Sequence, residues 1–219
     1  MVTDIPDWAK AYLKTERVEL ILEAIKKAES KTSGEIVPMI VRRSSTVGHV
    51  PIIVLSLLIA LFFALDGPGW QASYLGEHWA WYLGDIAFLA AISAFFSRLA
   101  CVQRILTSRL DQEDQVDMRA QLEFYESNIK NTKGSTGILL FASLMERRAV
   151  VLADKAISDK VPKEAWQEVC DLLVDGIKQG NMGLAFSEAI AQCGEILAPE
   201  FPIQADDMNE LKDQLIIKE

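Results

Sequence analysis

The chain has 219 residues, a formal net charge of −9 and a sequence pI near 4.9. An acidic surface repels phosphate backbones, so this composition argues against a nucleic-acid partner. The three cysteines, Cys101, Cys170 and Cys193, are widely spaced and match no metal-binding or redox motif. This usage is typical of buried thiols in a reducing compartment.

Two long apolar runs stand near the middle of the chain. The first, Val47 to Leu65, contains no charged residue; as a helix it would extend about 28 Å, close to the thickness of a hydrocarbon core. The second, Trp79 to Ala100, contains Asp85 near its start and Arg98 near its end. Between the runs, residues 66–70 (Asp-Gly-Pro-Gly-Trp) have the composition of a turn. We therefore expect residues 47–101 to form a helical hairpin that crosses a lipid bilayer twice, and not a buried soluble hairpin.

The basic residues predict the orientation of this hairpin. Arg42 and Arg43 precede the first run, whereas Arg98, Arg104 and Arg109 follow the second. The intervening segment, residues 66–78, contains no Lys or Arg. Because basic flanks stay in the cytoplasm, we expect both termini on the cytoplasmic side of a bacterial inner membrane. An aromatic cluster is expected at the outer end, where a membrane belt belongs: Trp70, Tyr74, Trp79, Trp81 and Tyr82.

The flanking sequences alternate between helical and strand patterns. Apolar periodicity predicts a helix from Thr15 to Lys31, followed by a strand from Glu35 to Val41. Pro38 within that strand argues for an edge position or a bulge. After the hairpin, Arg104 to Asn131 lacks Gly and Pro and predicts one long helix, which can continue the second span. Its apolar stripe includes Met118, Leu122, Tyr125 and Ile129.

The last third of the chain predicts an antiparallel strand pair and two helices. The strands are expected at 136–144 and 149–153, and the helices at 162–179 and 183–197. The fold class is therefore α/β, a small mixed sheet with packed helices, interrupted by the hairpin. Residues 1–46 and 102–202 should form one discontinuous cytoplasmic domain, and residues 203–219 an acidic tail.

Several short motifs, taken together, resemble the TPM domain family, found in bacteria and in chloroplast photosystem-repair proteins. They are the helix-to-strand junction from Ala28-Glu29 to Glu35-Ile36, the strand Thr136-Gly137-Ile138-Leu139-Leu140, and Asp154 after the second strand. Further on come Trp166, Gly183-Leu184, Phe201-Pro202 and residues 207–211 (Asp-Met-Asn-Glu-Leu). This ending is similar to that of a membrane-inserted bacterial subgroup.

The resemblance implies a TPM-like fold and several activities. Members of the family bind Ca²⁺ or another divalent cation, some are weak acid phosphatases, and others are accessory factors for membrane complexes. Metal-binding members carry Asp or Asn before the glycine of the first C-terminal strand, where this chain has Ser135-Thr136. An uncharged hydroxyl is a poor sole ligand for a hard cation. This departure argues against both metal binding and phosphatase activity.

The acidic side chains are the candidate site residues. Asp154, at the end of a strand, together with Asp111, Asp114 or Asp117, could hold a divalent cation through carboxylate oxygens. The alternative is that residues 111–117 form a solvated helix face. Asp85 is the one acidic residue within a span, and either marks an ion pathway or lies at the headgroup level.

No nucleophile motif is present, because the two histidines lie at the start of the first apolar run (His49) and directly before the second (His78). The sequence therefore favours a membrane-anchored, non-catalytic interaction or assembly factor, with a protein partner or a second copy of the chain bound. Small residues of the second span, from Ala87 to Ser97, permit close helix packing within the hairpin or against such a partner. The alternative function is a divalent-metal-dependent weak phosphatase.

Overall fold

The computed structural model describes residues 5–13, 15–76, 78–203 and 209–219; Asp207 and Met208 of the C-terminal motif lie outside this part. The chain divides into two compact units. We call residues 1–45 with 113–219 the α/β unit, and residues 46–112 the hairpin unit.

The α/β unit contains most of the helices and all the described strands. Its helices are α1 (Asp7–Lys10), α2 (Thr15–Glu29), most of α7 (Arg109–Glu126), η1 (Ile129–Asn131), α8 (Lys155–Ser158), η2 (Lys163–Trp166), α9 (Gln167–Gln179) and α10 (Met182–Leu197). Its strands are β1 (Glu35–Val41), β2 (Gly137–Ser143), β3 (Arg148–Ala153) and β4 (Ile216–Lys218).

The four strands form one mixed sheet in the order β3-β2-β1-β4. β1 runs parallel to β2, with Glu35 opposite Gly137 and Val41 opposite Ser143, and parallel to β4. β2 and β3 form the expected antiparallel pair. The predicted α/β class with a small mixed sheet is confirmed, whereas β4 is an element that the sequence analysis does not predict.

β1 is an interior strand, so the expected edge position of Pro38 is wrong. The backbone explains why proline is tolerated there. The Glu35 N–H donates toward β2, to the Thr136 carbonyl, and the Arg42 N–H donates to the Lys218 carbonyl on the β4 side. By alternation, the nitrogen of Pro38 faces the β4 side. There β4 pairs only with residues 39–41, so the missing donor breaks no ladder hydrogen bond.

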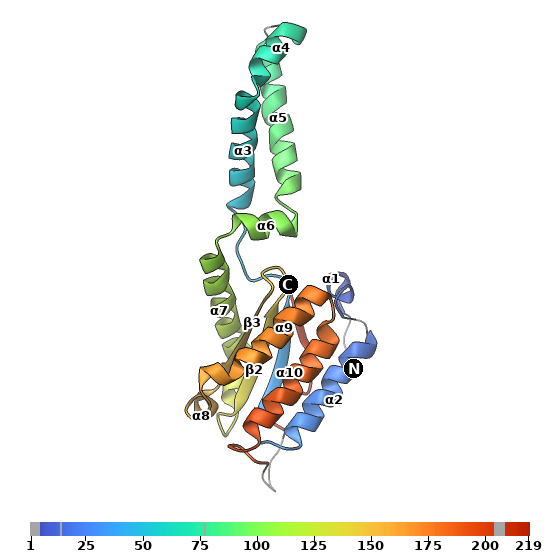
Figure 1. The fold of residues 1–219 in the computed structure, drawn as a ribbon, viewed down its shortest axis with the longest axis vertical. Helices are drawn as coiled ribbons and strands as arrows, with labels where there is room; N and C mark the ends of the chain where they lie inside the picture. Colours follow the sequence, from blue (N-terminus) through green and yellow to red (C-terminus); the bar gives the residue numbers. More distant parts are fainter. Residues whose placement is uncertain (1–4, 14, 77, 204–208) are drawn as a thin grey trace. The chain divides into compact units, whose positions relative to one another are not determined.

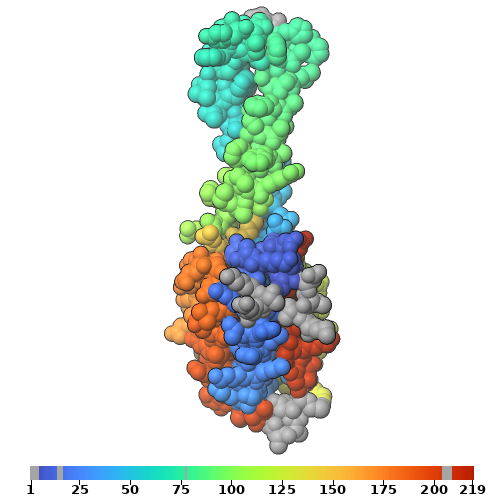
Figure 2. All heavy atoms as spheres, turned by 90° about the vertical axis from the view of Figure 1, so that its right-hand side faces the viewer, coloured from blue at the N-terminus to red at the C-terminus, as the bar shows by residue number. Residues whose placement is uncertain are grey.

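Helices cover both faces of the sheet (Figure 1). The alternating side chains of the strands build two separate cores, one on each face. Ile36, Ile40, Ile138 and Leu140 pack with α2, α9 and α10 in the larger core. On the other face, Val37, Met39, Val41, Leu139 and Phe141 pack against α7. Because side chains alternate along each strand, both faces of the sheet are apolar, and each face is covered by its own layer of helices. Figure 2 shows α2, in blue, at the surface of this unit.

The face of α7 that packs against the sheet is not the face that carries most of the predicted apolar stripe. Val116, Ala120 and Phe124 are buried, whereas Met118, Leu122 and Tyr125 are 62%, 49% and 60% exposed. The buried side chains include two small ones, which let the helix approach the sheet closely. The larger apolar side chains therefore form an exposed stripe, which we call the α7 stripe (Met118, Leu122 and Tyr125).

The hairpin unit consists of α3 (Val50–Ala64), α4 (Gly67–Leu75), α5 (Trp79–Phe96) and α6 (Ala100–Leu106). Within it α3 and α5 lie side by side (Figure 1). α3 is shorter than the predicted Val47–Leu65 run. The chain turns at Asp66, in a left-handed conformation, but residues 67–75 are helical and not a loop. Proline in the first turn of α4 is compatible with that helix, because the first N–H groups need no helical partner.

The predicted long helix from Arg104 to Asn131 is interrupted. α5 ends at Phe96, and Leu99 and Thr107 have extended backbones on either side of α6. The Gln112 amide donates to the carbonyl oxygens of Arg104 and Thr107, at 2.8 Å each. This buried side chain satisfies carbonyls that α6 leaves without helical donors, and so stabilises the break before α7.

Candidate functional site

Asp154 is the buried member of the four predicted metal ligands. Only 5% of the residue is exposed, and it follows β3, where its backbone N–H donates to the Gly137 carbonyl at 2.9 Å. One carboxylate oxygen caps α8 by accepting from the Lys155 N–H at 2.7 Å. The other, Oδ2, has no hydrogen-bond partner among the described residues. Asp154 therefore has one buried acceptor oxygen that no described residue satisfies.

The other three predicted ligands lie on exposed positions of α7. Asp111 lies in its first turn, and Asp114 and Asp117 follow along the helix. Partial burial raises the pKa of Asp117, and the neighbouring Asp114 also raises it, while Arg148 lowers it. Arg148 in turn pairs with Glu113 of α7 at 2.6 Å.

The ion pair between Arg148 and Glu113 places the acidic face of α7 far from Asp154. Arg148 begins β3, and Asp154 follows its last residue, so the two positions are about 20 Å apart along the strand. Glu113, Asp114 and Asp117 lie near the Arg148 end. In the described ranges, no three His, Cys, Asp or Glu side chains are grouped so that they could hold a metal ion. Asp154 alone falls short of the six to eight oxygens that Ca²⁺ takes, so these residues do not form a ready-made calcium site.

A different group of carboxylates is brought together where β1 begins, at the same end of the sheet as Asp154. Glu29, at the end of α2, accepts a hydrogen bond from the Ile36 N–H at 2.9 Å. Burial, together with Glu35 and Asp213, raises the pKa of Glu29 to about 8. Glu35 accepts from the backbone N–H groups of Glu210 and Leu211, at 3.0 and 3.3 Å. These contacts attach the C-terminal segment to the α2–β1 junction.

Glu29 should make the stability of the α/β unit depend on pH. Its folded-state pKa is raised above the ordinary value of 4.5, so the folded protein holds a proton that the unfolded chain releases. The free energy of unfolding should then fall as the pH rises from about 5 to 8. Glu29→Gln keeps an acceptor for Ile36 and removes the ionisation. We expect this variant to exceed the natural protein in stability at pH 8.5, by on the order of 2 kcal/mol, and to match it at pH 5.

Urea unfolding of the purified chain in mild detergent, repeated across this pH range, measures the effect. The matched control is Glu23→Gln, an exposed position on the same helix, which should change stability by less than about 0.5 kcal/mol at either pH. A Glu29→Gln protein with the same pH profile as the natural protein would show that Glu29 ionises normally in the fold.

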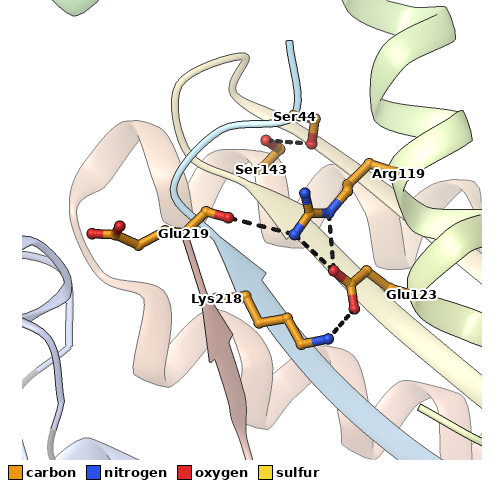
Figure 3. Close-up of polar contacts among 6 residues, drawn as sticks. All are labelled: Ser44, Arg119, Glu123, Ser143, Lys218 and Glu219. Atoms are coloured by element: carbon orange, nitrogen blue, oxygen red, sulfur yellow. Dashed lines mark hydrogen bonds and ion pairs between the residues drawn. The ribbon is translucent and has the colours of Figure 1, made fainter. Parts of the chain in front are cut away.

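A second buried carboxylate fastens β4 to α7. Glu123 is 1% exposed and accepts from the Arg119 guanidinium, with its Oε1 2.8 Å from Nη2 and 2.9 Å from Nε (Figure 3). Its other oxygen pairs with the Lys218 ammonium. Arg119 also donates to the backbone carbonyl of Glu219 at 3.4 Å. Two cations from separate elements thus neutralise one buried anion, which fixes the C-terminal strand.

A third buried carboxylate holds the end of β1. Glu146 accepts from the backbone N–H groups of Ser44 and Ser45, at 3.1 and 2.7 Å, and from the Ser143 hydroxyl. The Ser44 and Ser143 hydroxyls also contact each other at 3.0 Å (Figure 3). The residues directly before the hairpin unit are therefore anchored on the α/β unit. Sequence reasoning missed the roles of Glu29, Glu35, Glu123 and Glu146, because each draws at least one partner from a distant segment.

The hairpin unit exposes an unusually apolar surface. Helix α5 has a mean hydropathy of 1.5, and 6% of it is buried. Of the described helices, it alone is long and apolar enough to cross a membrane unaided. α3 and α4 reach this length and hydropathy only together, as a pair of helices bent by 61°. Ser93 is buried against α3 and donates to the Pro51 carbonyl at 2.7 Å. Exposed large apolar side chains include Ile52, Leu57, Phe63, Trp70, Ile86, Phe88 and Phe95.

Comparisons with known proteins agree with the predicted family. The model of the TPM domain matches residues 100–196. The NMR structure of BA42 protein from the psychrophilic bacterium Bizionia argentinensis is similar in fold, with a TM-score of 0.58. It is 21% identical, and the alignment covers 94% of each chain. No curated protein sequence matches the chain. The segment that the TPM domain model matches, residues 100–196, contains α7, β2, β3, α9 and most of α10.

Proposed function

We propose that this protein is a membrane-anchored, non-catalytic interaction or assembly factor, which presents its acidic TPM domain to protein partners at the cytoplasmic face of a bacterial inner membrane. The observation that carries the proposal is the exposed apolar surface of α3, α4 and α5. Soluble proteins rarely leave contiguous apolar patches larger than a few hundred Å² in water. A lipid bilayer is the solvent that such helices require.

The charge distribution supports the proposed orientation. No Lys or Arg occurs between Arg43 and Arg98, whereas basic residues stand on both flanks of this segment. Both termini, and with them the α/β unit, are then cytoplasmic. α3 has 15 residues and extends only about 22 Å, so it needs part of α4 to reach across the bilayer.

The α7 stripe supports the partner-binding part of the proposal. Three large apolar side chains, Met118, Leu122 and Tyr125, are each about half exposed or more on one helix face. They are bordered by the acidic residues Asp114 and Asp117. An apolar centre with a charged rim is the usual anatomy of a protein interface.

An affinity purification from native membranes in mild detergent tests this function. We expect the natural chain to retain a stoichiometric protein partner, or a second copy, and the double variant Met118→Gln/Leu122→Gln to lose it. The control is Leu20→Gln on α2, where a similarly exposed leucine lies outside the stripe. A bare monomer from both the natural and the control chains would contradict an assembly role.

A divalent-metal-dependent weak phosphatase is the second candidate, favoured by the unpaired Oδ2 of Asp154. It requires turnover of a generic phosphoester that depends on Ca²⁺ or Mg²⁺ and stops with chelator. On the non-catalytic proposal we expect no such turnover.

Asp154 also makes a testable prediction about metal binding. If Asp154 contributes a ligand, Asp154→Asn should abolish any rise in melting temperature that Ca²⁺ produces, because the amide removes the negative charge that a hard cation needs. The amide retains an oxygen that can cap α8, so the fold should persist. Differential scanning fluorimetry with and without Ca²⁺ gives the answer. An equal calcium shift in the natural protein and in the Asp154→Asn variant would remove Asp154 from any site.

A further inference from the structure

The hairpin unit contains a pocket with one carboxylate and three aromatic rings. The pocket has a volume of about 420 Å³ and is lined by Phe62, Gly67, Trp70, Gln71, Tyr74, Leu75 and Asp85. α4 supplies most of the lining, and α5 supplies the single acidic group. This volume falls within the range of small-molecule sites, which runs from about 300 to 1,000 Å³.

The carboxylate of Asp85 is only half satisfied. Its Oδ1 accepts a hydrogen bond from the Gln71 amide at 3.3 Å. Its Oδ2 is buried and has no hydrogen-bond partner in the part of the chain that the structure describes. No Lys or Arg occurs from Ser44 to Ser97, so this segment offers no lysine or arginine as a counter-ion. A buried carboxylate is costly without a cation, which must come from outside this segment.

The aromatic lining selects among cations. The centroids of the Trp70 and Tyr74 rings lie 4.9 Å apart, and the two ring planes are inclined by 36°. Phe62 is the third aromatic residue of the pocket lining. Aromatic faces attract organic ammonium groups through the ring quadrupole, and more strongly where water is excluded. A hard metal ion instead requires several oxygen ligands, and this pocket offers one carboxylate and one amide. The chemistry therefore favours an ammonium group.

The position of the pocket indicates the source of that group. Asp85 lies six residues after Trp79, about 9 Å along α5. Trp70, Tyr74, Trp79 and Tyr82 are exposed around this end of the hairpin, as in an aromatic belt at the headgroup level. We propose that the Asp85 pocket binds the ammonium group of a phospholipid headgroup. This inference rests on the proposed membrane insertion.

Lipid titration of the full chain in detergent, followed by native mass spectrometry, tests the proposal. The probes are phosphatidylethanolamine and phosphatidylglycerol with identical acyl chains. We expect phosphatidylethanolamine to bind at least about fivefold more tightly. Asp85→Asn should remove the preference, because it deletes the negative charge and keeps the size. Asp66→Asn is the matched control: it removes a carboxylate from the same end of the hairpin, outside the pocket lining, and should keep the preference.

Three results would overturn the proposal. One is equal binding of the two lipids by the natural chain, and another is an unchanged preference in Asp85→Asn. The third is binding of free ethanolamine with a Kd below about 1 mM and no gain from a lipid tail, which would assign the pocket to a soluble amine. Alkaline extraction of membranes separates these failures from failure of the proposed function. A chain that stays in the membrane pellet without lipid preference contradicts only the pocket, whereas a chain released into the supernatant contradicts the anchor.

Discussion

Replacing both Arg119 and Lys218 with Met should lower the free energy of unfolding of the α/β unit by about 3–5 kcal/mol, the loss typical of a buried charge deprived of its partners. Glu123 is 1% exposed, and these two cations are the groups that pair with it. Met preserves much of each apolar stem, so the loss reports mainly on the unpaired carboxylate. Urea unfolding followed by circular dichroism measures it.

Two further variants isolate the cause. Adding Glu123→Gln to the double variant should recover much of the stability, because an uncharged amide costs less to bury than a carboxylate. Arg148→Met, which breaks the half-exposed pair with Glu113, should cost less than about 1 kcal/mol. Equal losses in the buried and half-exposed variants would show that Glu123 reaches solvent, and would remove its assigned role in holding β4.

Gly137→Ala should destabilise the α/β unit by about 3 kcal/mol, at the upper end for overpacking of a core. A Cβ at this position would lie 2.2 Å from the carbonyl oxygen of Ile129 and 2.8 Å from its side chain. The nearest obstacle is backbone, so it cannot be relieved by a rotamer change. Gly137 also accepts the Asp154 N–H, so any shift is transmitted to the end of β3.

Gly48→Ala is the comparison, because a Cβ there meets no atom within 4 Å. It should leave the melting temperature within about 2 °C of the natural value. The same thermal scan applies to both proteins in detergent. A Gly137→Ala protein as stable as Gly48→Ala would mean that η1 can move away from β2, contrary to the packing described above.

The sequence patterns that predicted correctly are local. Val18, Ile21 and Ile25 recur with helical spacing on α2 and are buried, and β1 has its predicted bounds. The antiparallel strands β2 and β3 follow from two apolar runs around a four-residue turn. In each case the information lies within about 15 residues, where periodicity is informative.

The errors arise where a distant partner decides the structure. On α7, the large residues Met118, Leu122 and Tyr125 of the predicted apolar stripe are exposed, and the sheet packs against Val116 and Ala120 instead. β4 is a run of only three residues, Ile216–Lys218, in an acidic segment, and it is fixed by pairing with β1 and by Glu123. The break at Thr107 depends on a side chain, Gln112, that reaches back five residues. Composition carries no signal for these contacts.

The candidate metal site also shows that sequence patterns do not reveal contacts between distant residues. Asp154 was selected for its place after a strand, and it is buried with one unpaired oxygen. Its proposed partners on α7 were selected for charge alone, and Asp114 and Asp117 lie near the opposite end of β3. The carboxylates that do meet, Glu29, Glu35 and Asp213, come from segments separated by nearly the whole chain. Only the three-dimensional fold could identify them.

The proposed anchor is tested most directly by labelling cysteines with a membrane-impermeant maleimide in spheroplasts. Cys101, which is exposed, reports on the end of the second span. Ser73→Cys, in a Cys101→Ser background, reports on exposed α4. We predict that the cysteine introduced by Ser73→Cys is labelled in intact spheroplasts, and that Cys101 is labelled only after the membrane is permeabilised. Labelling of Cys101 from outside would contradict the account, because the end of the second span would then lie on the outer side of the membrane.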